Sequence, residues 1–555
     1  MRLKSAVAAL LLSTLAAVEP QYDVVISGGR IVDGTGNAWF TGDLAIRAGR
    51  IVRIAPGGVL ANAESRTRVD AKGLVVAPGF IDIQSHSRPA LLDGDGRVIS
   101  KITQGITTEI MGEGVTNAPA NEKTAMLITS DADRQTALRF AGPHGFRRWI
   151  GSMRGSVNFG SFAGATTLRM YAKGMSQGAA NDAELELMRT AVREAMEDGA
   201  FGIASALIYP PGEYASTAEL IELAKAMSPY GGVYITHMRS EADRLLEAID
   251  EAIEIGRKGG VAVEIYHLKA AGVRNWPKMR DAIAKINAAR AAGLDVSADM
   301  YPYEAGGTGL SACLPPWASA DGKLFDNLAN PEMRSKIRAE VLHQTTDWEN
   351  LCELSTPQGV LITQIVNDEN KQYSGKRLAQ IASMQKKEWI DAAMDLILSE
   401  RRRVESIFFM ASDDNLKLQL QQPWIKFGTD AGGIDPERAT QLAHPRAYGN
   451  FTRILGKYVR EEKVLPLEDA IRKMTSAVAA RLSIQDRGLL REGMFADITI
   501  FDPATATDRA TFEQPHQLST GVRHVFVNGV AVVRDGEATG AMPGRPVYGP
   551  GRKSE

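Results

Sequence analysis

The sequence predicts an α/β protein in which a closed (β/α)8 barrel of the TIM type is joined to a small β-sandwich. Three observations lead to this prediction. Eight short apolar runs alternate with helical stretches through the middle of the chain, hairpin patterns rich in Val and Ile occupy both ends, and two neighbouring apolar runs each end in a histidine. Alternating strands and helices favour a parallel sheet covered by helices, and eight of them favour its closure into a barrel.

The two histidines are His237 and His267, which follow the apolar runs 233–236 and 261–266. Between them, apolar residues recur at helix spacing from Leu245 to Ile255, with charged residues on the other face. A strand–helix–strand unit places its two strands side by side and parallel, so both imidazoles emerge at the same end of the sheet. A lone histidine would more often be structural, but this pairing favours a functional site.

Both ends of the chain read as short strands joined by tight turns. Residues 22–77 contain Gly-Gly, Asp-Gly and Ala-Gly turns between Val/Ile segments, and residues 485–548 repeat the pattern with a turn at Asn528-Gly529. Each piece is too small to bury a good core alone, so one discontinuous β domain is favoured over two separate ones.

The barrel is predicted to span residues 78–484. Its strand candidates are 79–84, 105–112, 157–164, 199–207, 232–237, 262–267, 294–303 and 424–430. The gap between the last two is far longer than the others. Residues 321–410 within it are mostly helical in pattern and charged, and we expect them to form an insertion over the barrel mouth.

Composition excludes several classes of protein. The chain has 555 residues and a net charge of -2, which gives no sign of a nucleic-acid or membrane-surface partner. Its two cysteines, Cys313 and Cys352, are too few for a cysteine-clustered metal site, and their pairing is left open. Residues 1–18 join a basic start to an apolar run and small residues, as in a signal peptide, which predicts a periplasmic or extracellular enzyme. The alternative is an ordinary N-terminal helix.

Functional side chains stand at the ends of several predicted strands. His86 and Glu113 follow the first two, His237 and His267 the fifth and sixth, and Asp430 the eighth. Nitrogen and oxygen ligands on one rim are what a hydrolytic Zn²⁺ requires. Such chemistry also needs a base, for which Asp430 is suitably placed, although a helix cap or a salt bridge would also account for an aspartate here.

The chain contains the segments PGFIDIQSHS, ASALIYPPGEYAS, YITHMRSE, YHLKA, SADMYPY, GTDAGG, HPRAYGNFTRILG and RGLLREGMFADITIFDP. Taken together, they resemble the N-acyl-D-amino-acid deacylases (D-aminoacylases) of the amidohydrolase superfamily. The resemblance runs from about residue 22 to about residue 548, with the motifs in family order. It implies a metal-dependent barrel with a β-sandwich from both termini, and hydrolysis of the amide of N-acylated D-amino acids.

By this resemblance, His237 and His267 match the two histidines that hold one tightly bound zinc ion. Asp430 matches the aspartate that acts as general base and then as general acid. The implied nucleophile is a metal-bound hydroxide.

Four further positions match residues that hold the substrate: Lys269, Tyr209, Tyr301 and Arg446. An arginine suits this role because its planar fork pairs with both oxygens of a carboxylate, such as the free α-carboxylate of an amino acid. Without the resemblance, packing would explain the two tyrosines equally well.

The chain departs from the family pattern at its other metal positions. The family's His-x-His on the first strand is Gln84-Ser-His86 here, and the Gly-Asn-Cys-Gly that supplies a cysteine ligand becomes Gly-Glu-Gly around Glu113. Glutamine is a poor zinc ligand, which argues against a second ion. A carboxylate is an acceptable one, so Glu113 can replace the cysteine. His86 either binds metal or lines the site.

Three functions remain open from the sequence. The first is deacylation of N-acyl-D-amino acids by a zinc enzyme with a small-molecule substrate. The second is hydrolysis of another amide or lactone, or of dipeptides with a D-residue. The third is a barrel that binds a ligand without catalysis; the two altered metal positions favour it, whereas the retained histidines and Asp430 oppose it.

Overall fold

The computed structural model describes residues 21–126, 128, 131–343 and 347–553. The expected signal peptide, residues 1–18, lies outside this part of the chain. None of the helices in the described part is long and apolar enough to cross a membrane.

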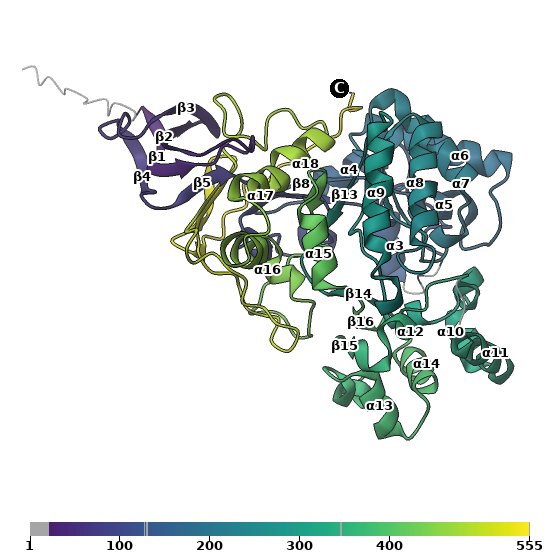
Figure 1. Cartoon of the computed structure of the whole chain (residues 1–555). Helices are drawn as coiled ribbons and strands as arrows, with labels where there is room; N and C mark the ends of the chain where they lie inside the picture. Colours follow the sequence, from purple (N-terminus) through teal and green to yellow (C-terminus); the bar gives the residue numbers. More distant parts are fainter. Residues whose placement is uncertain (1–20, 127, 129–130, 344–346, 554–555) are drawn as a thin grey trace, which may run out of the picture.

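Strands from both ends of the chain form one sheet, in the order β21-β20-β19-β18-β5-β1-β2-β3, with β4 beside β1. The two halves of this order come from opposite termini, and β5 and β18 join them as an antiparallel pair in which Val76 faces Ile500. Figure 1 shows these purple and yellow strands side by side. The single β domain predicted from both termini is confirmed. Its strands are β1 (Tyr22–Ile31), β2 (Phe40–Arg47), β3 (Arg50–Pro56), β4 (Ser65–Asp70), β5 (Val75–Pro78), β18 (Ile498–Phe501), β19 (Val522–Val527), β20 (Val530–Arg534) and β21 (Glu537–Ala538).

The middle of the chain forms a barrel of parallel strands, as predicted. One run of strands has the order β6-β7-β8 and the other β17-β13-β12-β11-β10-β9. A bridge between Ser85 and Ala431 joins the first strand to the last and closes the barrel. The strands are β6 (Phe80–Asp82), β7 (Ile106–Met111), β8 (Asn158–Ser161), β9 (Ala163–Gly164), β10 (Gly202–Ala206), β11 (Val233–His237), β12 (Ala262–Ile265), β13 (Val296–Met300) and β17 (Ile425–Phe427).

Helices cover the outside of the barrel (Figure 1). Local signals explain where they begin and end: Asn181 forms a capping box with Glu184 at the start of α6, and Gly260 ends α8 in the left-handed conformation. The helices here are α1 (Arg88–Leu92), α2 (Ile99–Ile102), α3 (Asp131–Leu138), α4 (Gly145–Ser152), α5 (Ala165–Lys173), α6 (Asp182–Glu197), α7 (Thr217–Met227), α8 (Leu245–Gly259), α9 (Lys278–Ala291), α15 (Asp413–Leu420), α16 (Arg446–Arg453), α17 (Leu467–Met474) and α18 (Ser476–Arg481).

An insertion with its own apolar core lies below the barrel in Figure 1. It begins earlier than residue 321, because β14 (Ala305–Gly309) already pairs with β16 (Glu405–Phe409), which also pairs with β15 (Val360–Ile362). The sequence did not predict β14, because its glycines give no alternating pattern of apolar and polar side chains. Its helices are α10 (Leu324–Ala329), α11 (Pro331–Leu342), α12 (Leu351–Ser355), α13 (Leu378–Gln385) and α14 (Trp389–Glu400). Cys313 and Cys352 form a buried disulfide inside it, which answers the question of their pairing.

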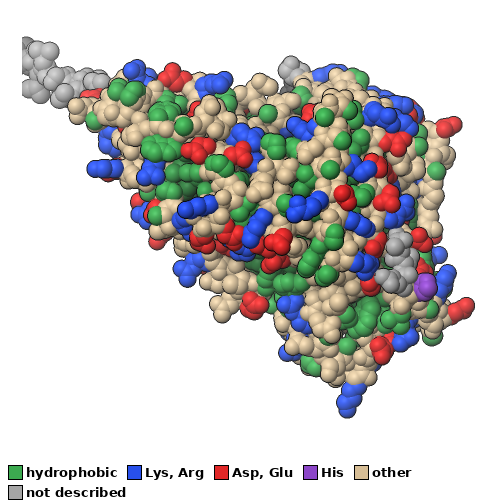
Figure 2. Space-filling model, in the orientation of Figure 1, with side chains coloured by type: hydrophobic (Ala, Val, Ile, Leu, Met, Phe, Trp, Pro, Cys, Tyr) green, Lys and Arg blue, Asp and Glu red, His purple; other side chains and the backbone are tan. Residues whose placement is uncertain are grey.

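The C-terminal segment closes the end of the barrel where the strands begin. Backbone amides of Gly544, Val547 and Gly549 donate to carbonyls just before or within β8 and before β10, at 2.8–2.9 Å. The residues predicted to form the site lie at the opposite end, where the strands finish. On the face in Figure 2, acidic and basic side chains are interspersed over the surface, in keeping with the small net charge.

Candidate metal centre and active site

A cavity of about 730 Å³ opens at the carboxyl ends of the barrel strands. The structure brings every predicted site residue to its wall, including the four expected to hold substrate: His86, Glu113, Tyr209, His237, His267, Lys269, Tyr301, Asp430 and Arg446. Side chains from seven different strand ends converge there, which is the usual place for the active site of such a barrel.

Glu113 and the two paired histidines form a group that fits a metal ion. Glu113 Oε1 lies 3.2 Å from His237 Nδ1 and 3.4 Å from His267 Nε2. Ligand atoms of the three residues all lie within 4.8 Å of one another. Two imidazole nitrogens and one carboxylate oxygen are a donor set that zinc accepts in hydrolytic sites, with a position left for water. The geometry supports Glu113 in the place of the missing cysteine.

His267 and Asp430 adopt an unusual backbone conformation. Their φ angles are +34° and +49°, in a region that residues with a Cβ rarely occupy. Buried hydrogen bonds hold both residues in place. The backbone amide of His267 donates to Asp299 Oδ1 at 2.8 Å, and the backbone amide of Asp430 donates to the backbone carbonyl of Gln84 at 2.8 Å. Such strain gathers at functional sites, where the surroundings impose it.

Glu241 lies directly behind the two histidines and was not singled out from the sequence. Its Oε1 is 2.9 Å from His267 Nδ1 and 2.8 Å from Lys269 Nζ. Burial would raise the pKa of this carboxyl, but the charges of Lys269 and His267 outweigh burial and hold it well below the usual range. A carboxylate that accepts from Nδ1–H of a histidine leaves Nε2 free to bind metal and fixes the ring orientation. Glu241 thereby prepares His267 as a ligand.

The insertion contributes Glu349 to this region. Glu349 Oε1 accepts from Ser240 Oγ at 3.0 Å and from the backbone amide of Glu241. Its other oxygen is buried without a hydrogen-bond partner among the described residues. Burial, and then the negative charge of Glu241, raise the pKa of Glu349 to about 7. The insertion therefore places the carboxyl group of Glu349 against the loop that carries Glu241, behind the metal centre. Burial favours the neutral form of this carboxyl group.

A second buried network fixes the base of the barrel mouth. Lys101 is fully buried and its Nζ lies 2.8 Å from Asp82 Oδ2, 3.0 Å from Glu109 Oε1 and 2.6 Å from Thr429 Oγ1. Asp82 also accepts from the amide of Thr429 at 2.8 Å. This network joins β6, β7 and β17 immediately below Asp430, and its ions are paired, as buried charges must be.

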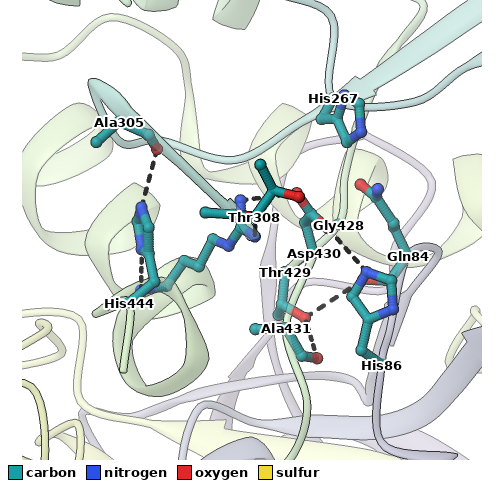
Figure 3. A network of polar contacts seen from close by, with 12 residues as sticks. Gln84, His86, His267, Ala305, Thr308, Gly428, Thr429, Asp430, Ala431 and His444 are labelled. Carbon is teal, nitrogen blue, oxygen red and sulfur yellow. Dashed lines mark hydrogen bonds and ion pairs between the residues drawn. The ribbon is translucent and has the colours of Figure 1, made fainter. Parts of the chain in front are cut away.

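Asp430 lies between two positively polarised partners, as Figure 3 shows for His86. Its Oδ1 is 2.9 Å from His86 Nε2 and its Oδ2 is 2.7 Å from Arg446 Nη1. Burial would raise the pKa of Asp430, but the charge of Arg446 and the hydrogen bond with His86 lower it below the ordinary value. Asp430 is therefore an ionised carboxylate at neutral pH, ready to accept a proton.

The four predicted substrate-holding residues surround the same space. Two cations lie close to the Tyr301 ring, with Arg446 Cζ 4.6 Å and Lys269 Nζ 5.5 Å from its centroid. Tyr209 packs edge-on against His237, with ring centroids 5.3 Å apart. Among the described residues, Arg446 Nε is buried without a hydrogen-bond partner. A buried guanidinium donor without an acceptor is costly, so a carboxylate from a ligand would satisfy it.

His444 is a further histidine of the site that was not among the predicted site residues. His444 lines the cavity and supports Arg446, because its Nδ1 accepts from the Arg446 amide at 3.0 Å while its Nε2 is 2.8 Å from the carbonyl of Ala305 (Figure 3). Burial and the charge of Arg446 hold the pKa of His444 well below its usual range. A neutral His444 is suited to this positioning of the arginine.

Comparison with known proteins identifies close relatives. A family model described as Amidohydrolase family matches residues 379–533. A D-aminoacylase from Alcaligenes xylosoxydans xylosoxydans is 34% identical over 532 residues, covering 94% of this chain and 97% of that protein. A solved D-aminoacylase structure matches with a TM-score of 0.78 and 31% identity, covering 95% of this chain and 100% of that one. The binuclear centre of that protein is described as activated by one metal and attenuated by a second. An N-acyl-D-glutamate deacylase from Bordetella bronchiseptica, complexed with zinc and a phosphonate that mimics the tetrahedral intermediate, has a TM-score of 0.77, 32% identity, and covers 95% and 99%.

Proposed function

The chain belongs to the D-aminoacylase family of the amidohydrolase superfamily, and from this premise we propose that it is a metal-dependent deacylase of N-acyl-D-amino acids. The observation that carries the proposal is the convergence, in one cavity, of a His/His/Glu donor set with an ionised aspartate and a buried arginine donor. A metal site alone would fit many reactions. The arginine adds a requirement for a carboxylate in the substrate.

His237, His267 and Glu113 would hold the zinc ion, with Glu241 orienting His267 from behind. When bound, zinc lowers the pKa of a water molecule and polarises the carbonyl of the amide. The protein's own part begins with Asp430. As a carboxylate held ionised by Arg446 and His86, it takes the proton from the attacking water and later delivers it to the leaving amine.

Arg446 would bind the free α-carboxylate beside the Tyr301 ring, and Lys269, which pairs with Glu241, would add its positive charge nearby. Tyr209, which packs against His237, would hold the acyl carbonyl near the ion. Fixing both ends of the substrate in this way aligns the scissile amide with Asp430, which is how binding energy is converted into rate. These roles also argue against a barrel that merely binds a ligand.

The test is a hydrolysis assay of matched N-acetyl-D- and N-acetyl-L-amino acids with zinc-loaded protein. We expect release of the free amino acid from the D-series, and loss of activity with a chelator. Asp430→Asn should retain zinc but lose a factor of about 10²–10⁴ in kcat. Glu405→Gln is the matched control, because Glu405 lines the same cavity but pairs with Arg403 instead of the metal group. Turnover of dipeptides alone, or an Asp430→Asn variant with normal kcat, would contradict the proposal.

We also propose that the enzyme is exported to the periplasm or the cell exterior. The basic and apolar start of residues 1–18 supports export, and so does the buried disulfide, because disulfides persist mainly in oxidising compartments. Cell fractionation combined with N-terminal sequencing tests this. A cytoplasmic protein that keeps its first residues would contradict it.

A further inference from the structure

Gln84 is a fully buried side chain held rigidly between the first and last barrel strands. The backbone carbonyl of Gln84 accepts from the backbone amide of Asp430 at 2.8 Å, and its backbone amide donates to Asp82 Oδ1 at 3.2 Å. Gly428 packs against it so closely that a Cβ there would lie 2.7 Å from Gln84 Cβ. The side chain points toward Glu113, and Figure 3 shows it beside His86.

The Gln84 amide divides the two oxygens of Glu113 between different partners. Its Nε2 donates to Glu113 Oε2 at 2.6 Å, whereas Glu113 Oε1 faces His237 Nδ1 and His267 Nε2 at 3.2 and 3.4 Å. The opposite orientation of the amide would place its oxygen against a carboxylate oxygen, which is repulsive. One oxygen of Glu113 is thus directed to the ion, and the other is occupied by a hydrogen bond.

A second group of possible metal ligands, formed by His86, Glu113 and Asp430, shares Glu113 with the His237, His267 and Glu113 group. Each of its facing atoms already has a partner. Glu113 Oε2 accepts from Gln84, His86 Nε2 is 2.9 Å from Asp430 Oδ1, and Asp430 Oδ2 is 2.7 Å from Arg446 Nη1. A second cation here would have to displace the Gln84 amide from Glu113 Oε2. It would also lie close to the positive charge of Arg446, and the neutral Gln84 would offer no further ligand to offset that repulsion.

We propose that Gln84 is a positioning residue that reserves Glu113 for a single ion, so that this chain forms a mononuclear centre even in excess zinc. The inference builds on the proposed function only in taking zinc as the resident metal. It distinguishes this chain from the relative with a binuclear centre that a second metal attenuates. Excess zinc should accordingly not attenuate this enzyme through a second ion at this centre.

The test is metal stoichiometry, measured on metal-free full-length protein without substrate. Calorimetric titration with Zn²⁺, and titration with Co²⁺ followed by its visible absorption, should both end at one equivalent. Gln84→His should bind a second equivalent, because it supplies an imidazole beside Glu113 Oε2 and removes the amide. Gln364→His is the matched control, since Gln364 lines the same cavity but is not a hydrogen-bond partner of Glu113, and its replacement should leave one equivalent.

A second variant tests the hydrogen bond itself. Gln84→Leu keeps the volume but frees Glu113 Oε2, and we expect zinc affinity to fall by about 10–100-fold, as for other residues that orient a metal ligand. Two tightly bound ions in the wild type, or unchanged stoichiometry in Gln84→His together with unchanged affinity in Gln84→Leu, would overturn the inference. A protein that binds one ion but hydrolyses no N-acyl-D-amino acid would instead contradict the proposed function and leave this inference standing.

Discussion

Glu349 offers a stability prediction that can be worked out from the structure. Its pKa is about 7 in the folded protein against 4.5 for an ordinary glutamate, because it is buried beside Glu241. Between these two values the unfolded chain has lost the proton that the folded chain retains, so folding stability falls as the pH rises from about 4.5 to about 7 and then levels off. At 1.36 kcal/mol per pKa unit, the carboxylate costs about 3 kcal/mol above that range.

Glu349→Gln removes this cost, because an amide is neutral at every pH and can still accept from Ser240 and the amide of Glu241. We expect no gain in stability at about pH 4.5 and a gain of about 3 kcal/mol at about pH 8. Since unfolding entropy is about 2 cal/mol/K per residue, the melting temperature should rise by about 3 °C at the higher pH.

Thermal unfolding of both proteins across this pH range is the assay. Glu353→Gln serves as the control, because Glu353 belongs to the same segment but forms a partly exposed pair with Arg274, which should be worth less than about 1 kcal/mol at either pH. Parallel stability curves for wild type and Glu349→Gln would refute the reasoning. They would mean that the buried carboxyl of Glu349 is compensated in the folded protein.

Three other predictions concern the site and its support. Arg446→Lys keeps the positive charge but loses the planar guanidinium that can donate to both oxygens of a carboxylate. It should raise KM about 10–100-fold in steady-state assays, with a smaller effect on kcat, and an unchanged KM would show that Arg446 does not bind the substrate. Lys101→Met leaves two buried carboxylates without their cation and should destabilise the fold by about 3–5 kcal/mol in urea unfolding, whereas a neutral effect would show that the network is dispensable. Replacing Cys313 and Cys352 by serine opens a loop with a sequence separation of 39 and should cost about 4 kcal/mol, a loss that reductant should reproduce in the wild type but not in the variant.

Strand-end positions were the part of the site that the sequence could predict. A residue directly after a parallel barrel strand has its location set by the strand itself, which is why His237, His267 and Asp430 meet in the structure as expected. The start of the insertion was harder, because the glycines of β14 (Ala305–Gly309) give no alternating pattern and the strand is recognisable only through its pairing with β16.

Residues that act through another side chain could not be predicted in the same way. Glu241 lies in a loop, and its role depends on meeting His267 and Lys269 from the next strand. Glu349 belongs to the insertion, whose docking onto that loop no local periodicity specifies. Gln84 could be recognised from the sequence as a departure from His-x-His, but its hydrogen bond to Glu113 is a tertiary contact.

The charges around the metal group explain why one ion is sufficient here. Glu113, Glu241 and Asp430 provide three negative charges, and Lys269 and Arg446 provide two positive ones, so these five side chains alone carry one net negative charge without a metal. One zinc ion makes the balance positive by a single charge, which matches an N-acyl amino acid with one carboxylate. A second ion would leave the floor with three excess positive charges, beside an arginine and with no additional carboxylate to offset them. A buried site tolerates unbalanced charge poorly, so the neutral amide of Gln84 is better suited to this chain than a further metal ligand.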